Sequence, residues 1–137
     1  NPSSIPAEQL KKWYEEGVIE LWGRRDDMAT VLAESHIVCL PSYREGLPKV
    51  LIEAAACGRP IVTTDAPGCR EIVRNGLNGF LVPIHDAAAV ADALKKLINS
   101  PELRREMGMR GRELVEKEFS LEKVNTETLA LYEELVQ

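Results

Sequence analysis

Three short apolar segments constrain the fold of this chain most strongly. They cover residues 36–40, 60–63 and 80–82, and helical patterns lie between and after them. Their side chains are almost continuously apolar, which is typical of strands that are buried on both faces of a sheet. A fourth strand is predicted at residues 18–22. Strands that alternate with helices favour parallel β-α-β units, so we expect an α/β fold with helices on both faces.

Start and stop signals mark the helices. Ser4 and Pro6 predict a first helix that ends at Gly17, and acids at 26–27 predict the start of a second. A third helix is expected at residues 48–57, ended by Gly58. An apolar stripe predicts a helix from Ala87 to residue 98.

Two more helices are expected in the last third of the chain. Ser100 followed by Pro101 is a clear helix start, and Gly108 and Gly111 inside this helix allow close packing or a kink. Ser120 would cap a last helix. We therefore divide the chain into a sheet-forming region, residues 1–83, and C-terminal helices that pack on it, residues 84–137.

Composition and charge exclude several classes of protein. Of 137 residues, 45% are hydrophobic and 28% are charged, which suits one domain with a real core. The net charge of −5 offers no broad surface for nucleic acid, and no apolar run approaches the ~20 residues of a membrane span. The histidines and cysteines lack metal-ligand spacing, so no metal site is expected. Cys39, Cys57 and Cys69 are expected to be free thiols in a reducing compartment.

The segment from Pro41 to Pro48 lies where a strand passes into a helix. Ligands of open α/β sheets bind at this carboxyl edge of the strands, and a helix N-terminus there favours an anion such as phosphate. Glu45 precedes the helix and Glu53 lies eight residues later, within it. Two such carboxylates could accept hydrogen bonds from the hydroxyls of a sugar or ribose. The alternative is structural, since Glu53 could simply pair with Lys49 one turn earlier.

The order and spacing of several motifs resemble the retaining glycosyltransferases of group 1, family 4, over nearly the whole chain. The two glutamates separated by seven residues match that family's donor-site signature. The matching segments are Pro41-Ser42, Glu45-Gly46-Leu47-Pro48, Glu53-Ala54, Gly58-Arg59-Pro60-Ile61-Val62, Thr64-Asp65, Gly68, Glu71 and the run from Asn75 to Pro83. The resemblance is to the later part of the C-terminal, nucleotide-sugar-binding domain of the GT-B fold. It implies a three-layer, Rossmann-like parallel sheet with C-terminal helices.

This resemblance implies roles for individual residues. Glu45 would be the catalytic residue, contacting hydroxyls of the transferred sugar as a positioning and electrostatic group rather than a nucleophile. Glu53 would hold the ribose hydroxyls. Backbone amides around Gly46, Leu47 and Lys49 would hold the sugar and the diphosphate.

A second group of implied contacts lies before the first motif. Gly23, Arg24 and Arg25 match the family's loop against the base of the nucleotide. Family members are generally metal-independent, so no metal and no cofactor besides the nucleoside-diphosphate-sugar donor is implied. Arg70 and Arg74, with Arg44, are expected to be surface or loop-anchoring charges.

The implied reaction transfers a sugar from a nucleoside-diphosphate donor to an acceptor hydroxyl with retention of configuration. Pro67-Gly68-Cys69-Arg70-Glu71 resembles a subgroup that builds bacterial surface polysaccharides on polyprenyl carriers. The glycan or lipid-linked acceptor would be brought by an N-terminal domain, and the parent enzyme would work in the cytoplasm, at the inner face of the membrane.

Parts of the family pattern have no counterpart in this sequence, namely the upstream diphosphate-binding Arg and Lys and the acceptor domain. The chain also begins with Asn1 rather than Met. We therefore expect a C-terminal fragment that is inactive alone, binds donor weakly or not at all, and self-associates through surfaces that normally face the missing parts. Two alternatives remain open: a non-catalytic nucleotide- or sugar-binding module of this architecture, and a nucleotide-sugar epimerase.

Overall fold

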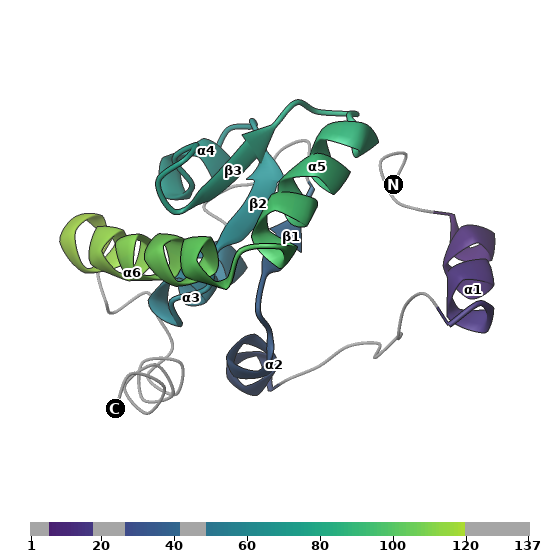
Figure 1. The fold of residues 1–137 in the computed structure, drawn as a ribbon, viewed down its shortest axis with the longest axis horizontal. Helices are drawn as coiled ribbons and strands as arrows, with labels where there is room; N and C mark the ends of the chain where they lie inside the picture. Colours follow the sequence, from purple (N-terminus) through teal and green to yellow (C-terminus); the bar gives the residue numbers. More distant parts are fainter. Residues whose placement is uncertain (1–5, 18–26, 42–48, 120–137) are drawn as a thin grey trace.

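The computed structural model describes residues 6–17, 27–41 and 49–119 (Figure 1). Three strands of these segments form one parallel sheet in the order β1-β2-β3. Their bounds are β1 (Val38–Leu40), β2 (Ile61–Thr64) and β3 (Gly79–Val82). The parallel pairing with helical connections confirms the predicted α/β class.

Helices connect and follow the strands. Their bounds are α1 (Ala7–Glu15), α2 (Met28–Glu34), α3 (Lys49–Ala56), α4 (Cys69–Ile72), α5 (Ala87–Ile98) and α6 (Pro101–Glu118). Every predicted helix that falls on described residues is present, with bounds shifted by at most a few residues. The strand predicted at 18–22 and the helix predicted from Ser120 lie outside the described residues. The short helix α4 was not predicted.

The sheet has helices on both faces, which gives three layers. One core cluster joins Ile61 of β2 to α3, α4 and the end of α6, while a second joins the next residue, Val62, to α5 and the start of α6. Figure 1 shows α5 in front of the sheet and α3 on its other side. Neighbouring strand residues point to opposite faces, so a strand such as β2, which is buried at every position, is covered on both sides.

β1 departs from the prediction that its segment is buried on both faces. Cys39, in the middle of the strand, is exposed, and Val38 and Leu40 are only partly buried. β2, the central strand, is buried throughout because it has a strand on each side and helices on both faces. β1 is the edge strand of the described sheet, so the apolar run correctly predicted a strand but overestimated how far it is covered.

The long helix α6 packs closely against α3 and the turn that follows α3. A Cβ atom at Gly108 would lie 2.0 Å from the carbonyl oxygen of Gly58, so only glycine allows this approach. At Gly111 a Cβ atom would lie 3.3 Å from the Cβ of Asn78. The two glycines therefore provide close packing, one of the two roles that their positions predicted.

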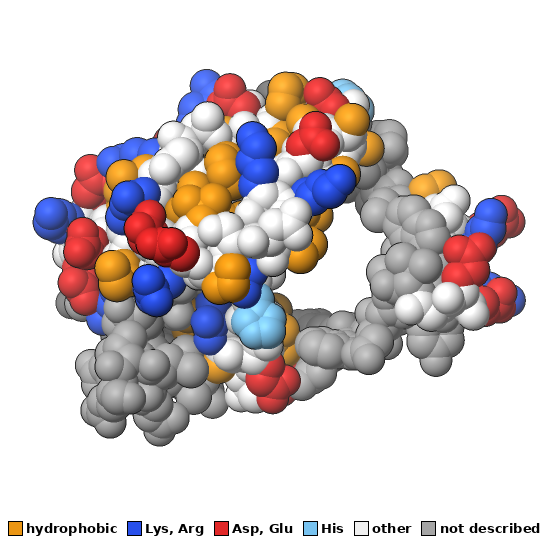
Figure 2. All heavy atoms as spheres, in the orientation of Figure 1, with side chains coloured by type: hydrophobic (Ala, Val, Ile, Leu, Met, Phe, Trp, Pro, Cys, Tyr) orange, Lys and Arg blue, Asp and Glu red, His pale blue; other side chains and the backbone are white. Residues whose placement is uncertain are grey.

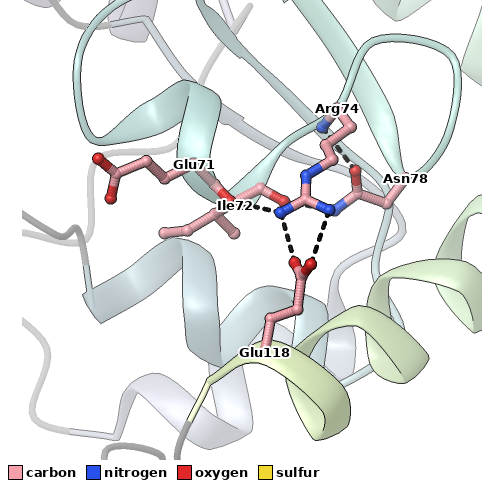
Figure 3. A network of polar contacts seen from close by, with 5 residues as sticks. All are labelled: Glu71, Ile72, Arg74, Asn78 and Glu118. Atoms are coloured by element: carbon pink, nitrogen blue, oxygen red, sulfur yellow. Dashed lines mark hydrogen bonds and ion pairs between the residues drawn. The ribbon is translucent and has the colours of Figure 1, made fainter.

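Asn78 organises the loop between α4 and β3 and supports α6 (Figure 3). Its side chain is fully buried, accepts a 2.9 Å hydrogen bond from the backbone N–H of Arg74 and donates a 3.0 Å bond to the carbonyl oxygen of Ile72. The Arg74 guanidinium forms a two-pronged ion pair with the carboxylate of Glu118 at the end of α6. Arg74 is thus the loop-anchoring charge that the sequence predicted.

Charges of both signs are interspersed on the visible face. Figure 2 shows Lys and Arg side chains beside Asp and Glu over α5 and α6, without a field of one sign. Among the described residues, no helix combines the length and the apolar character that crossing a membrane requires.

Candidate functional site

The carboxyl ends of the three described strands meet at one edge of the sheet. Pro41 follows β1, Asp65 follows β2 and Pro83 follows β3. The β2–β3 ladder continues one bond past β2, because the backbone N–H of Asp65 donates to the carbonyl oxygen of Val82 at 2.8 Å. This is the edge at which open parallel sheets bind ligands.

Helix α3 carries the described part of the predicted donor site. Its residues from Leu51 to Ala56 are all buried, and leucine and alanine favour helix formation. The helix stops at Gly58, whose φ of 70° is the left-handed conformation typical of a helix C-terminus. Because the chain runs from β1 into α3, the N-terminal end of α3 lies toward the carboxyl edge of the sheet.

Glu53 is a buried carboxylate on this helix. The residue is only 5% exposed although six of the other seven residues of α3 are apolar. The ammonium group of Lys49 lies 3.8 Å from Glu53 Oε1, and the Lys49 side chain is 69% exposed. The structural alternative from the sequence is therefore present as an ion pair, but it is longer than a hydrogen bond. Within the described segments the carboxylate has no other side-chain partner, so it keeps most of its capacity to accept hydrogen bonds.

The remaining predicted site residues cannot be placed in this arrangement. They lie outside the described residues, so the structure brings together only Lys49 and Glu53 from the predicted set. The others are Gly23, Arg24, Arg25, Glu45, Gly46 and Leu47.

The loop after β2 is held by an ion pair across its ends. Arg70 Nε lies 3.2 Å from Asp65 Oδ1, and both side chains are more than half exposed. The same guanidinium donates to the Asp65 carbonyl oxygen at 3.3 Å. Arg70 is therefore a loop-anchoring charge, as predicted, while Arg44 lies outside the described residues.

The loop after β3 leads into α5. Asp86 caps this helix, with Oδ1 accepting a 2.9 Å hydrogen bond from the backbone N–H of Ala89. His85 has a φ of 64°, a left-handed conformation that is unusual for a residue with a side chain. His85 and Asp86 thus form the entry to α5.

Thr63 is a polar residue of this edge that the sequence analysis missed. Its side chain is fully buried in β2, and Oγ1 donates a 2.6 Å hydrogen bond to the carbonyl oxygen of Leu40, the last residue of β1. The signal in the sequence was a pair of hydroxyl residues, Thr63 and Thr64, after the apolar start of the strand.

The cysteines and acidic groups give no metal centre among the described residues, where no three His, Cys, Asp or Glu side chains converge. None of the three cysteines, all of which are described, forms a disulfide. Cys57, at the opposite end of α3 from the sheet edge, is buried, and this burial raises the pKa of its thiol to about 11. Arg59 and Arg112 oppose the shift and Glu53 adds to it, and the value of about 11 includes all of these effects. A thiol with so high a pKa is a poor nucleophile near neutral pH.

Comparison with known proteins identifies the family. Residues 2–100 match the family model for glycosyl transferases, group 1. The chain belongs to the group 1 glycosyltransferases. Among curated group 1 relatives, N-acetyl-alpha-D-glucosaminyl L-malate synthase of Bacillus anthracis is 34% identical over 128 residues, which are 93% of this chain and 34% of that protein. The capsular polysaccharide biosynthesis glycosyltransferase CapM of Staphylococcus aureus is 38% identical over 97 residues, 71% of this chain and 26% of CapM.

Solved glycosyltransferase structures share the fold. Sucrose-phosphate synthase of Thermosynechococcus elongatus superposes with a TM-score of 0.78 at 29% identity, covering 94% of this chain and 33% of that one. A variant of TarM from S. aureus, solved with fondaparinux, α-GlcNAc-glycerol and UDP, gives a TM-score of 0.78 at 27% identity, covering 92% of this chain and 26% of TarM. The group 1 chain described here thus spans about a quarter to a third of the proteins that it matches. These structures support the predicted GT-B relationship.

Proposed function

We propose that this chain forms the donor-binding part of a retaining glycosyltransferase that transfers a sugar from a nucleoside-diphosphate donor to an acceptor hydroxyl. The observation that carries the proposal is Glu53, a carboxylate that is 95% buried on α3 and paired, within the described residues, only with the distant ammonium of Lys49. Membership of the group 1 family supports the transferase class.

The chemistry of a buried carboxylate favours a ligand with paired hydroxyls. An ionised carboxylate accepts about four hydrogen bonds, and burial without donors is costly. The two ribose hydroxyls of a nucleotide provide two adjacent donors and no positive charge. We assign Glu53 to them, and Lys49, exposed beside it at the start of α3, to the neighbouring diphosphate through its backbone amide.

The proposal includes residues that the structure does not describe. Glu45 would position the transferred sugar as the catalytic residue, and the backbone of Gly46 and Leu47 would contact the sugar and diphosphate. Gly23, with Arg24 and Arg25, would lie against the base. Their places in the family motifs support these roles. No metal is part of the proposed mechanism.

UDP is the first donor nucleotide to test, because TarM was solved with UDP. A lipid-linked acceptor is supported by a relative from Campylobacter jejuni, an N,N'-diacetylbacillosaminyl-diphospho-undecaprenol N-acetylgalactosaminyltransferase, 34% identical over 104 residues. We place the proposed reaction in surface-glycan synthesis in the cytoplasm, at the inner face of the membrane. The acceptor would be held by a domain outside this chain.

The test is a titration of the isotope-labelled chain with UDP, GDP and ADP, followed by backbone amide chemical shifts. We expect one nucleotide to bind weakly, with a Kd of about 1 mM or above, since this chain lacks the family's upstream diphosphate contacts. The amide shifts should change first at the start of α3. Glu53→Gln keeps the size of the side chain but removes its charge, and should weaken binding about tenfold.

Glu113→Gln is the matched control, since Glu113 is an exposed glutamate on α6. It should bind the nucleotide like the wild type. Equal binding by Glu53→Gln and the wild type would refute the assigned role of Glu53. A micromolar Kd would contradict the expected weak binding by this chain alone. In a longer transferase that contains this segment, Glu45→Ala should lower kcat by about 10²- to 10³-fold, and near-normal turnover would rule out its catalytic role.

A further inference from the structure

The buried hydroxyl of Thr63 joins β2 to the last residue of β1. Thr63 is 0% exposed, and its Oγ1 donates a 2.6 Å hydrogen bond to the carbonyl oxygen of Leu40. Its predecessors in β2, Ile61 and Val62, are apolar and fully buried. Valine has nearly the same shape as threonine and no polar group to desolvate, so packing alone does not account for a hydroxyl here.

This hydrogen bond lies at the end of the β1–β2 pairing. The β1–β2 pairing ends at Leu40 opposite Thr63, whereas the β2–β3 pairing continues to Thr64 opposite Val82. The chain therefore leaves β1 at the point where the hydroxyl of Thr63 binds. A side-chain hydrogen bond at the end of a ladder fixes the last carbonyl and hence the direction of the departing chain.

Along the chain, α3 is the next described element after β1. Leu40 and Pro41 are followed by α3 at Lys49, and the first turn of α3 is anchored by the complete burial of Leu51. The described residues thus hold this connection at both ends, by Thr63 on the β1 side and by core packing on the α3 side. Glu53 lies on the anchored helix, one turn after Lys49.

We propose that Thr63 is a positioning residue for donor binding: its hydroxyl fixes the carboxyl end of β1 relative to α3 and Glu53. This inference rests on the proposed function, because the ligand is the nucleotide assigned above. Thr63 acts through Leu40 and is not assigned any contact with the ligand.

Two variants separate a positioning role from a merely structural one. Thr63→Val removes the hydroxyl and keeps the volume, so it should weaken UDP binding by about five- to tenfold, while the loss of the Leu40 hydrogen bond lowers stability to about the same extent as in Thr63→Ser. Thr63→Ser keeps the hydroxyl and removes a buried methyl group, so it should be less stable and still bind with wild-type affinity. The two variants should therefore be similar in stability and differ in affinity.

A chemical-shift measurement without ligand tests the hydrogen bond itself. The carbonyl ¹³C shift of Leu40 should move in Thr63→Val and stay near the wild-type value in Thr63→Ser. Thr30→Val, on the remote helix α2, is the control and should change neither the Leu40 carbonyl shift nor the affinity. UDP titration and urea unfolding of the four chains complete the experiment.

The outcomes distinguish the two proposals. If Thr63→Val binds UDP like the wild type, or if the affinities of both variants fall in proportion to their stabilities, the role of Thr63 is refuted and the proposed function stands. If neither the wild-type chain nor a longer transferase that contains it binds UDP, GDP or ADP, the proposed function is refuted and the donor-binding role of Thr63 with it.

Discussion

Arg112 of α6 donates a hydrogen bond from its buried guanidinium to the carbonyl oxygen of Ala56, the last residue of α3, at 3.3 Å. The same guanidinium donates through Nε to Glu116 Oε1 at 2.7 Å. The last carbonyls of a helix have no partner within the helix and carry partial negative charge, so a cation there is stabilising. Arg112 thereby joins α6 to the helix that carries Glu53.

Other arginines also donate hydrogen bonds to carbonyl oxygens near the ends of helices. Arg59 donates to the carbonyl oxygens of Leu32 and Ala33 near the end of α2, at 3.0 and 2.7 Å. Arg104 donates to the carbonyl oxygen of Leu97 at the end of α5, at 2.6 Å. In each case the arginine comes from a later segment of the chain, so the pairs hold successive layers together as well as capping the helices.

Replacing Arg112 should therefore destabilise the fold. Arg112→Met keeps the aliphatic part of the side chain but leaves the Ala56 carbonyl without this donor, and should lower the free energy of unfolding by about 2 kcal/mol. Urea unfolding would show a lower midpoint with an unchanged slope. Arg105→Met is the control, since Arg105 is exposed on the same helix, and should cost about 0.5 kcal/mol or less. Equal losses in the two variants would contradict this account.

The close contact of Gly108 with Gly58 predicts that position 108 does not tolerate a side chain. A Cβ atom in Gly108→Ala would lie 2.0 Å from a backbone oxygen, which cannot rotate away, so we expect a loss of about 3 kcal/mol. Gly111→Ala is the matched control: its Cβ atom would lie 3.3 Å from Asn78 Cβ, and the gain in helix propensity, about 1 kcal/mol, offsets the strain. Thermal unfolding of both variants measures the difference. Similar melting temperatures would show that α6 can shift away from Gly58.

Local signals predicted much of this fold. The apolar runs located all three described strands, and an apolar stripe located α5. The start signal at Ser100 located α6 accurately, because Ser100 caps this helix by a direct hydrogen bond. The burial of β1 was overestimated, because edge position depends on strand order and not on the run itself. Helix α4 was missed, since four residues are too few for periodicity to show.

In the candidate site, only a residue that belongs to a local sequence motif could be predicted. Glu53 was singled out by its spacing from Glu45, and the structure shows that it is buried. The hydrogen bond between Thr63 and Leu40 joins residues 23 positions apart, so no local sequence pattern predicts it. The capping arginines are similar: Arg112 and Ala56 are 56 residues apart. Contacts of this kind follow from the tertiary arrangement and become visible only in the structure.

The buried thiol of Cys57 predicts a pH dependence of stability. Burial raises its pKa from 9.0 to about 11 in the folded chain. Between these values the unfolded chain loses the thiol proton while the folded chain keeps it, so the free energy of unfolding falls as the pH rises from 9 to 11. Below pH 9 the thiol is protonated in both states and contributes no slope.

Cys57→Ala isolates this contribution from that of lysine and tyrosine, which titrate in the same range. Urea unfolding across the range should give a less steep decline for Cys57→Ala than for the wild type, by the order of 2 kcal/mol at the alkaline end. Parallel declines in the two chains would show that the thiol does not ionise differently on folding.

His85 lies in a left-handed conformation that glycine adopts more easily. With a φ of 64°, its side chain costs about 1–2 kcal/mol, and His85→Gly removes that cost but adds freedom to the unfolded chain. We expect a net gain of about 0.5 kcal/mol in the free energy of unfolding, whereas the β-branched His85→Val should lose about 1 kcal/mol or more. His36→Gly is the control, because His36 has no positive φ, and should lower stability. Thermal unfolding of the three variants measures their order of stability. Higher stability in both glycine variants would show that the conformation of His85 does not cause the stabilisation.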